Sequence, residues 1–170
     1  MTESAPEVVC DAGPLIHLDE LGCLDLVLDF SRIMIPQAVW SEAQHHRLSV
    51  VSHLRGVFDL VSVRIADDPD FQAWSRLFQL HSGEQAALWL LRSYTKAVFL
   101  TDDAAARLAA QSVGYRTHGT LAVLLRAIRR GRRTRKEVLG ILREIPEKSS
   151  LHLRPSLLKE VIAQVEVVGS

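Results

Sequence analysis

The chain has 170 residues, of which 48% are apolar and 24% are charged, enough for one soluble domain with a sizeable core. Lysine plus arginine and aspartate plus glutamate balance at 20 each, so overall charge gives no attraction to nucleic acid, and any attraction must come from uneven placement. The chain starts without a signal-like apolar segment, and its longest apolar run, AALWLL, is too short to cross a bilayer. We therefore expect a single cytoplasmic domain over residues 1–170, with no membrane partner.

The first part of the chain alternates short apolar runs with helical segments. VVCDA predicts a buried strand that contains Cys10 as a small core residue, since Cys10 and Cys23 fit no metal-ligand spacing. RIMIP predicts a second strand, ended by Pro36, and Glu42 lies in the short helix that follows. LVSV, near residue 61, predicts a further strand.

The middle of the chain carries clear helix-start signals. Asp68 is predicted to cap a helix that Pro69 begins, and Ser82 with Gln85 has the pattern of a capping box that opens the helix EQAALWLLRSY. AVFLT predicts another buried strand, and YRTH a short one. The helix AAARLAA lies between these two strands, and either Asp102 or Asp103 is a suitable N-cap for it.

The last third of the chain predicts three helices. Apolar residues recur at helical spacing in each, at Leu121, Leu124, Leu125 and Ile128, at Val138, Ile141, Leu142 and Ile145, and at Leu158, Val161, Ile162 and Val165. Gly131 follows the first helix as a stop, Thr134 and Glu137 form a capping box at the second, and Pro146 is expected to end it. EKSSLHLRP is expected to connect the last two helices.

Four carboxylates follow the predicted strands or begin the predicted helices. They are Asp11, Glu42, Glu84 and Asp103. Strands that alternate with helices predict a parallel sheet covered on both faces, and ligands bind such sheets beyond the carboxyl ends of the strands. Carboxylates that converge there repel each other unless a cation neutralises them, and Mg²⁺ and Mn²⁺ prefer oxygen ligands. The pattern therefore indicates a metal site and a phosphoryl-transfer or hydrolysis enzyme.

Each acid also has a purely structural interpretation. Asp11 could be a turn or helix N-cap, Asp103 an N-cap, and Glu84 a first-turn acid favoured by the helix dipole. Glu42 could be a solvated helix residue. The remaining aspartates of the first part of the chain are expected at the surface, namely Asp19, Asp25, Asp29 and Asp59.

A basic segment, RAIRRGRRTRK, stands out in a chain without net charge. It contains Arg126, Arg129, Arg130, Arg132, Arg133, Arg135 and Lys136. Such a patch could neutralise RNA phosphates near the acids, bind an acidic partner segment, or form a solvated turn with cations at a helix C-terminus. Sequence leaves these three interpretations open.

In their order and spacing, VVCDAGPLIHL, IPQAVWSE, SGEQAALWLL, VFLTDDAAARLAA and HGTLAVLLRAIRRG resemble the PIN-domain proteins. The resemblance runs from about Val8 to the C-terminal helix and is greatest with short prokaryotic stand-alone members that are often paired with antitoxins. It implies a three-layer α/β/α fold around a parallel sheet of four to five strands. It also implies a ribonuclease that depends on Mg²⁺ or Mn²⁺.

The resemblance assigns roles to particular acids. Asp11 would be the first catalytic acid, Glu42 the second, Glu84 the third and Asp103 the fourth, with Asp102 as an adjacent metal ligand beside Asp11, Glu84 and Asp103. Two departures from the common pattern are Gly13, where many relatives have a hydroxyl, and a glutamate as the third acid.

Arg107, one turn beyond the fourth acid, would orient Asp103 or contact RNA, unless it is a solvated helix residue. The RNA-binding residues would be Arg107 together with Arg126, Arg129, Arg130, Arg132 and Arg133.

The leading hypothesis is therefore a metal-dependent endoribonuclease that acts as the toxin of a toxin–antitoxin pair. RNA, an antitoxin protein and a second copy of the chain are the expected partners, with Trp40, Val51 and Leu54 forming a dimer face, an antitoxin groove or simply core. The alternatives are a non-catalytic PIN-like module that binds RNA or protein, and a metal-dependent nuclease or phosphohydrolase for DNA or nucleotides.

Overall fold

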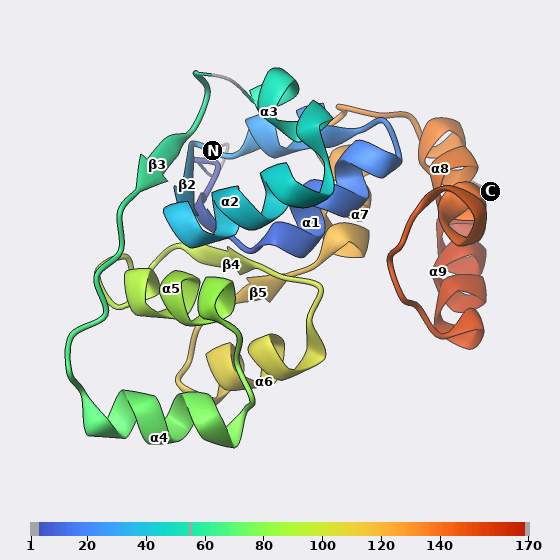
Figure 1. Ribbon diagram of the computed structural model, residues 1–170. Helices are drawn as coiled ribbons and strands as arrows, with labels where there is room; N and C mark the ends of the chain where they lie inside the picture. Colours follow the sequence, from blue (N-terminus) through green and yellow to red (C-terminus); the bar gives the residue numbers. More distant parts are fainter. Residues whose placement is uncertain (1–3, 55, 169–170) are drawn as a thin grey trace.

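Five parallel strands form one sheet in the order β3-β2-β1-β4-β5 (Figure 1). The strands are β1 (Glu7–Cys10), β2 (Arg32–Pro36), β3 (Asp59–Val61), β4 (Val98–Leu100) and β5 (Thr117–His118). The computed structural model describes residues 4–54 and 56–168. The predicted parallel sheet is confirmed, including the strand expected near residue 61.

Helices cover both faces of the sheet, so the predicted three-layer α/β/α architecture is confirmed. One face is covered by α1 (Ala12–Glu20), the short 3-10 helix η1 (Leu24–Asp29), α2 (Gln37–His46), α3 (Leu48–Leu54), α7 (Thr120–Arg129), α8 (Arg135–Lys148) and α9 (Pro155–Val167). The other face is covered by α4 (Pro69–Leu77), α5 (Ser82–Leu91) and α6 (Ala104–Ser112). Side chains alternate along each strand, so Val8 and Cys10 enter the first core while Val9 enters the second.

Most predicted helix ends are confirmed, and two are wrong. Asp68 caps α4, and Thr134 with Glu137 forms a capping box at α8. The expected box of Ser82 and Gln85 is wrong, because the N-cap of α5 is one residue earlier, at His81. Pro146 does not end α8, which continues to Lys148 and closes with a bond from the amide of Ser149 to the carbonyl of Ile145.

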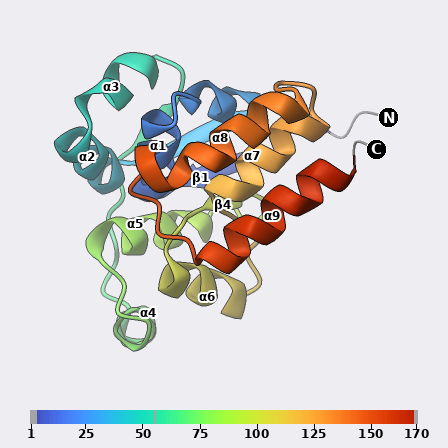
Figure 2. The same ribbon diagram turned by 90° about the vertical axis from the view of Figure 1, so that its right-hand side faces the viewer.

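On the first of these faces, the helices α8 and α9 form a hairpin that packs against α7 (Figure 2). Their connection is tied to the end of α1 by the carboxylate of Glu20. That carboxylate accepts hydrogen bonds from the hydroxyl of Ser149 at 2.9 Å and from the amide of Ser150 at 2.7 Å. The connection is therefore held at the C-terminal end of α1.

Two aspartates expected at the surface, Asp19 and Asp29, are buried, so that expectation was wrong for them. Asp19 accepts hydrogen bonds from Arg47 and Ser49. Asp29 accepts hydrogen bonds from two arginines of the basic segment, Arg130 at 3.1 Å and Arg132 at 2.7 Å, and also pairs with Arg126. A buried carboxylate needs such partners, and these came from segments distant in sequence.

Two further expectations concern apolar segments. Trp40 and Leu54 are buried in the core, which favours the core interpretation of that segment over a docking face. In residues 4–54 and 56–168, no helix has the length and apolarity needed to cross a membrane.

Replacing Asp29 by asparagine should lower the free energy of unfolding by about 1.5–3 kcal/mol, because it removes charge-assisted hydrogen bonds to Arg130 and Arg132. The matched control is Asp25→Asn, which breaks a more exposed pair with Arg133 and should cost about 1 kcal/mol or less. Urea denaturation at neutral pH measures both. Equal losses for the two variants would mean that the Asp29 cluster does not anchor the turn between α7 and α8.

Candidate active site

One cavity of about 260 Å³ lies at the carboxyl edge of the sheet. It is lined by Asp11, Gly13, His17, Glu42, Glu84, Asp102, Asp103, Ser150, Leu151 and His152. Every acid predicted as catalytic or metal-binding therefore faces the same cavity, although these acids come from four separate parts of the chain. The connection between α8 and α9 supplies the remaining wall.

Asp11 is the most deeply buried of these acids, with 6% of its surface exposed. Its side chain caps α1 through the amide of Ala12 and accepts a hydrogen bond of 2.9 Å from the hydroxyl of Thr101. Burial, reinforced by the charges of Glu84 and Glu42, raises the pKa of Asp11 to about 7, and the two hydrogen bonds only partly oppose the rise. Asp11 is thus both a helix cap and a carboxylate under charge repulsion.

Glu84 is also buried, in the first turn of α5. Its carboxylate accepts a hydrogen bond of 2.8 Å from the amide of His81, which closes the start of the helix. Burial raises the pKa of Glu84, and the charge of Asp103 adds to the rise. Both structural and functional interpretations therefore apply to Glu84.

Glu42 is exposed on α2, and its carboxylate lies against the start of α5. A Cβ atom on Gly83 would approach Glu42 Oε2 to 3.1 Å. Because Gly83 has no side chain, the Glu42 carboxylate reaches the cavity beside Glu84.

Asp103 and Asp102 have different surroundings, although they are adjacent. Asp103 is the N-cap of α6, where one oxygen accepts from the amide of Ala106 at 2.8 Å. Asp102 lies 2.7 Å from His17 Nδ1 and accepts from both the amide and the hydroxyl of Thr120, at 2.7 and 2.6 Å. Both Asp102 oxygens are therefore engaged by the protein, whereas one Asp103 oxygen faces the cavity without a side-chain or backbone donor in the described structure.

Sequence analysis missed His17 and Thr120 as parts of this site. Both residues lie in segments that resemble the PIN-domain proteins, but no local pattern assigns them a role, and only the adjacency of β1, β4 and β5 brings them to Asp102. Conversely, His118, which ends β5, does not line the carboxylate cavity.

The carboxylates are gathered but not tightly clustered. In the part of the chain that the structure describes, no three or more histidine, cysteine, aspartate or glutamate side chains are close enough to hold a metal ion directly. Their shared cavity and raised pKa values nevertheless make the site one that favours a cation.

A family model described as PIN domain matches residues 7–167, which is nearly the whole chain. The chain belongs to the PIN-domain family. No curated protein matches the sequence significantly. PIN domains are generally nucleases and typically use divalent metal ions, so the family assignment agrees with a carboxylate-lined cavity at the sheet edge.

The arginines predicted to bind RNA are not gathered in the carboxylate cavity of this PIN domain. The side chain of Arg107 donates to the carbonyl of Thr101 at 3.2 Å, and among the described residues it forms no hydrogen bond or ion pair with the carboxylate of Asp103. The other predicted arginines lie in the last turn of α7 and in the turn after it, and several pair with acids of η1: Arg126, Arg130 and Arg132 with Asp29, and Arg133 with Asp25. Much of the basic segment is therefore engaged in holding the turn.

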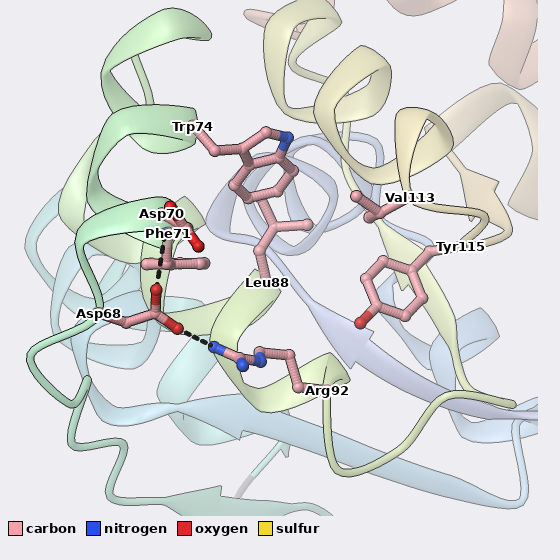
Figure 3. Close-up of a pocket in the computed structure, with 8 residues that line it drawn as sticks. All are labelled: Asp68, Asp70, Phe71, Trp74, Leu88, Arg92, Val113 and Tyr115. Atoms are coloured by element: carbon pink, nitrogen blue, oxygen red, sulfur yellow. Dashed lines mark hydrogen bonds and ion pairs between the residues drawn. The ribbon is translucent and has the colours of Figure 1, made fainter.

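A second cavity, of about 390 Å³, lies at the opposite ends of α5 and α6, beside α4 (Figure 3). Trp74, Tyr115 and Leu88 contribute apolar walls, while Asp68 pairs with Arg92 at 3.0 Å on one side. None of the carboxylates predicted as catalytic lines this cavity. Its aromatic contacts pack α4 against α5, which makes it a poor candidate for hydrolytic chemistry.

The raised pKa of Asp11 predicts how the stability of metal-free protein depends on pH. Its ordinary pKa is 3.8 and its folded-state pKa is about 7, so the folded state binds this proton more tightly than the unfolded state does. The contribution to stability is therefore full below about pH 4 and is lost as the pH rises toward 7, by about 1.4 kcal/mol per pH unit at most.

In chelator, Asp11→Asn should remove this part of the pH dependence and make the variant more stable than wild type at pH 8 but not at pH 4. Thermal unfolding between pH 4 and 8 measures the difference. Asp70→Asn, which changes an exposed acid of α4, is the control and should follow wild type. A variant at Asp11 that parallels wild type across the range would show that Asp11 carries no unfavourable charge.

Proposed function

We propose that this PIN domain is a metal-dependent endoribonuclease in which Asp11, Glu42, Glu84 and Asp103 form the catalytic acid set. The observation that carries the proposal is the convergence of these acids on one cavity, where burial raises the pKa of Asp11 and the charges of Glu84 and Glu42 add to the rise. Helix capping does not explain the position of Glu42, because Glu42 lies inside α2 and caps no helix, yet it lines the cavity with two buried acids.

The donor set suits Mg²⁺ or Mn²⁺. Carboxylate oxygens are hard ligands, and Mg²⁺ usually binds proteins through one or two carboxylates while it retains several waters. A cavity of about 260 Å³ leaves room for a partly hydrated ion, which fits acids that are near one another without being in direct ligand contact. Asp11, Glu84 and Asp103 would hold the ion, with Glu42 at the exposed side.

When bound, such an ion lowers the pKa of water and stabilises negative charge on a phosphodiester. The protein residues hold the acids in position. Thr101 and the amide of Ala12 fix the carboxylate of Asp11, and the amide of His81 fixes Glu84. Asp102 acts as a positioning residue, because its bonds to His17 and Thr120 join the starts of α6 and α7 to α1.

The preference for RNA and the role as a toxin rest on the resemblance to short stand-alone PIN proteins. An antitoxin that covers the cavity would be the corresponding protein partner. The second candidate function is a non-catalytic RNA-binding or protein-binding module. It is favoured by one observation, the lack of a ready three-ligand metal group among residues 4–54 and 56–168.

Wild-type protein should cleave a labelled pool of single-stranded RNA when Mn²⁺ is added, and chelator should stop the cleavage. Asp11→Asn and Glu84→Gln should each lower the rate by about 10²-fold or more, because each weakens metal-based stabilisation worth several kcal/mol. Asp70→Asn should cleave like wild type, since Asp70 does not line the cavity. Equal rates for wild type and Asp11→Asn would rule out this acid set.

Calorimetry with Mn²⁺ separates the two candidate functions. An enzyme should bind Mn²⁺ in the wild type and bind it more weakly in Asp11→Asn. RNA binding without Mn²⁺ binding and without cleavage would support the non-catalytic module. Cleavage of DNA or of nucleotides in preference to RNA would keep the acid set but change the substrate.

A further inference from the structure

The arginines of this chain divide into two groups. Several form ion pairs with carboxylates: Arg32, Arg47, Arg92, Arg126, Arg130, Arg132, Arg133 and Arg143. Within the residues that the structure describes, others form no such pair, and these include Arg107, Arg116, Arg129 and Arg154. The charge of the arginines in the second group is not offset by an adjacent carboxylate of the described residues, so it is more available to an external anion.

His118 lies in β5, the outer strand of the sheet, and the charges of three of these arginines act on it. His118 is half-buried, and its Nδ1 atom has no hydrogen-bond partner. Burial lowers the pKa of His118, and the charges of Arg116, Arg129 and Arg107 add to this effect, as does that of Arg126. The edge at β5 is therefore positively charged, and a neutral His118 lies among the cations.

A groove extends from the carboxylate cavity and is lined by Arg107, one of the arginines whose charges act on His118. It has a volume of about 390 Å³ and runs between the α6–α7 region and the connection that leads into α9. Arg107 and Arg154 line the groove, and the groove shares Asp102, Leu151 and His152 with the carboxylate cavity. A chain that leaves the acids on this side would therefore enter the groove.

Arg107 lines the groove close to Asp102, since a Cβ atom on Gly119 would approach both Asp102 Oδ1, at 2.6 Å, and an Nη atom of Arg107, at 2.7 Å. One of its Nη atoms donates to the carbonyl of Thr101 at 3.2 Å, which fixes the guanidinium in place. Its Nε atom is buried and lacks a hydrogen-bond partner. Because the bond to Thr101 uses only one of the five N–H donors of Arg107, the guanidinium retains donors for an anion in the groove that it lines.

Phosphate is the anion that best explains both halves of this arrangement. Arginine binds phosphate through several donors, and the carboxylate cavity proposed above acts on phosphodiesters. An acidic peptide could bind the arginines, but its carboxylates would be repelled by the acids of the adjacent cavity, and the proposed reaction gives it no role there. Leu108, Leu121 and Leu157 in the groove provide apolar surface for ribose and base faces.

We propose that the phosphate backbone of an RNA strand runs from the carboxylate cavity through this groove to the β5 edge, bound by Arg107, Arg154, Arg116 and Arg129. The turn between α7 and α8 is then a structural element, held by Asp29 and Asp25, and not the main RNA contact. This inference rests on the proposed nuclease function, because that function supplies the strand.

The test compares two triple variants that lose the same net charge. We call the proposed RNA-binding arginines the track, namely Arg107, Arg116, Arg129 and Arg154. Arg116→Gln/Arg129→Gln/Arg154→Gln removes the exposed arginines of this track. Arg64→Gln/Arg76→Gln/Arg143→Gln removes exposed arginines elsewhere and is the matched control. Arg107 is left unchanged because its bond to the carbonyl of Thr101 is partly buried, whereas the bond from Arg116 to the carbonyl of Lys96 is exposed.

Binding of a fluorescently labelled single-stranded RNA is measured by anisotropy in chelator, at several salt concentrations, so that no cleavage occurs. The track variant should bind at least about 10-fold more weakly at low salt, and its plot of log affinity against log salt should be less steep by about 2, since each lost phosphate contact on a single strand changes the slope by about 0.7. The control should remain within about 3-fold of wild type. The single variant Arg154→Gln should lose part of the affinity without any effect on thermal stability.

Equal weakening of both triple variants would mean that only bulk charge matters and would overturn the proposal, as would a failure of wild type to bind RNA. An acidic polypeptide, polyglutamate, serves as a competing probe. If polyglutamate bound in a way that depended on these arginines while RNA did not bind, the groove would be a site for an acidic protein segment and not for RNA.

Binding and cleavage are separate readouts, so the two proposals can fail independently. Track-dependent binding without Mn²⁺-dependent cleavage would retain the groove and reject the enzyme. Cleavage that is equally fast in both triple variants would retain the enzyme and reject the groove.

Discussion

The position of Asp11 at the end of β1 is the constraint on which the site depends. Its backbone amide donates to the carbonyl of Leu100 at 2.8 Å, and its carboxylate accepts from the hydroxyl of Thr101, so β1 and β4 fix both ends of the residue. Burying a carboxylate is costly unless it is hydrogen-bonded or neutralised. Here two hydrogen bonds offset only part of the cost, and the acid retains a pKa of about 7. A bound cation would offset the remaining free-energy cost of burying the charged carboxylate.

Three of the site acids also stabilise helix starts. Asp11 caps α1, Asp103 caps α6, and Glu84 closes the first turn of α5. Because each carboxylate has two oxygens with several lone pairs, capping uses part of its capacity and leaves part for a ligand. The structural and functional interpretations of these residues are therefore compatible, and the helix starts orient the acids toward one cavity.

The sheet, its order of elements and the main acids could be predicted because they depend on local patterns, such as the buried run ending at Asp11 and the helix start at Glu84. What could not be predicted depended on contacts between distant segments. Asp29 was predicted to lie at the surface because its partners, Arg130 and Arg132, are about one hundred residues away in the sequence. The partners of Asp102 were missed for the same reason. The capping box at α5 was assigned one residue too late because serine is a commoner N-cap than histidine.

The distribution of arginines follows from the same need to neutralise buried acids. Asp29 engages cations that would otherwise belong to the basic turn, and so the charge available to a ligand lies elsewhere, at the β5 edge and at Arg154. A cavity of acids repels a polyanion, and binding of a strand beside it requires cations nearby. Glu20 secures the connection that carries Arg154 by its bonds to Ser149 and Ser150. The α8–α9 hairpin thus places positive charge next to the acids without neutralising them.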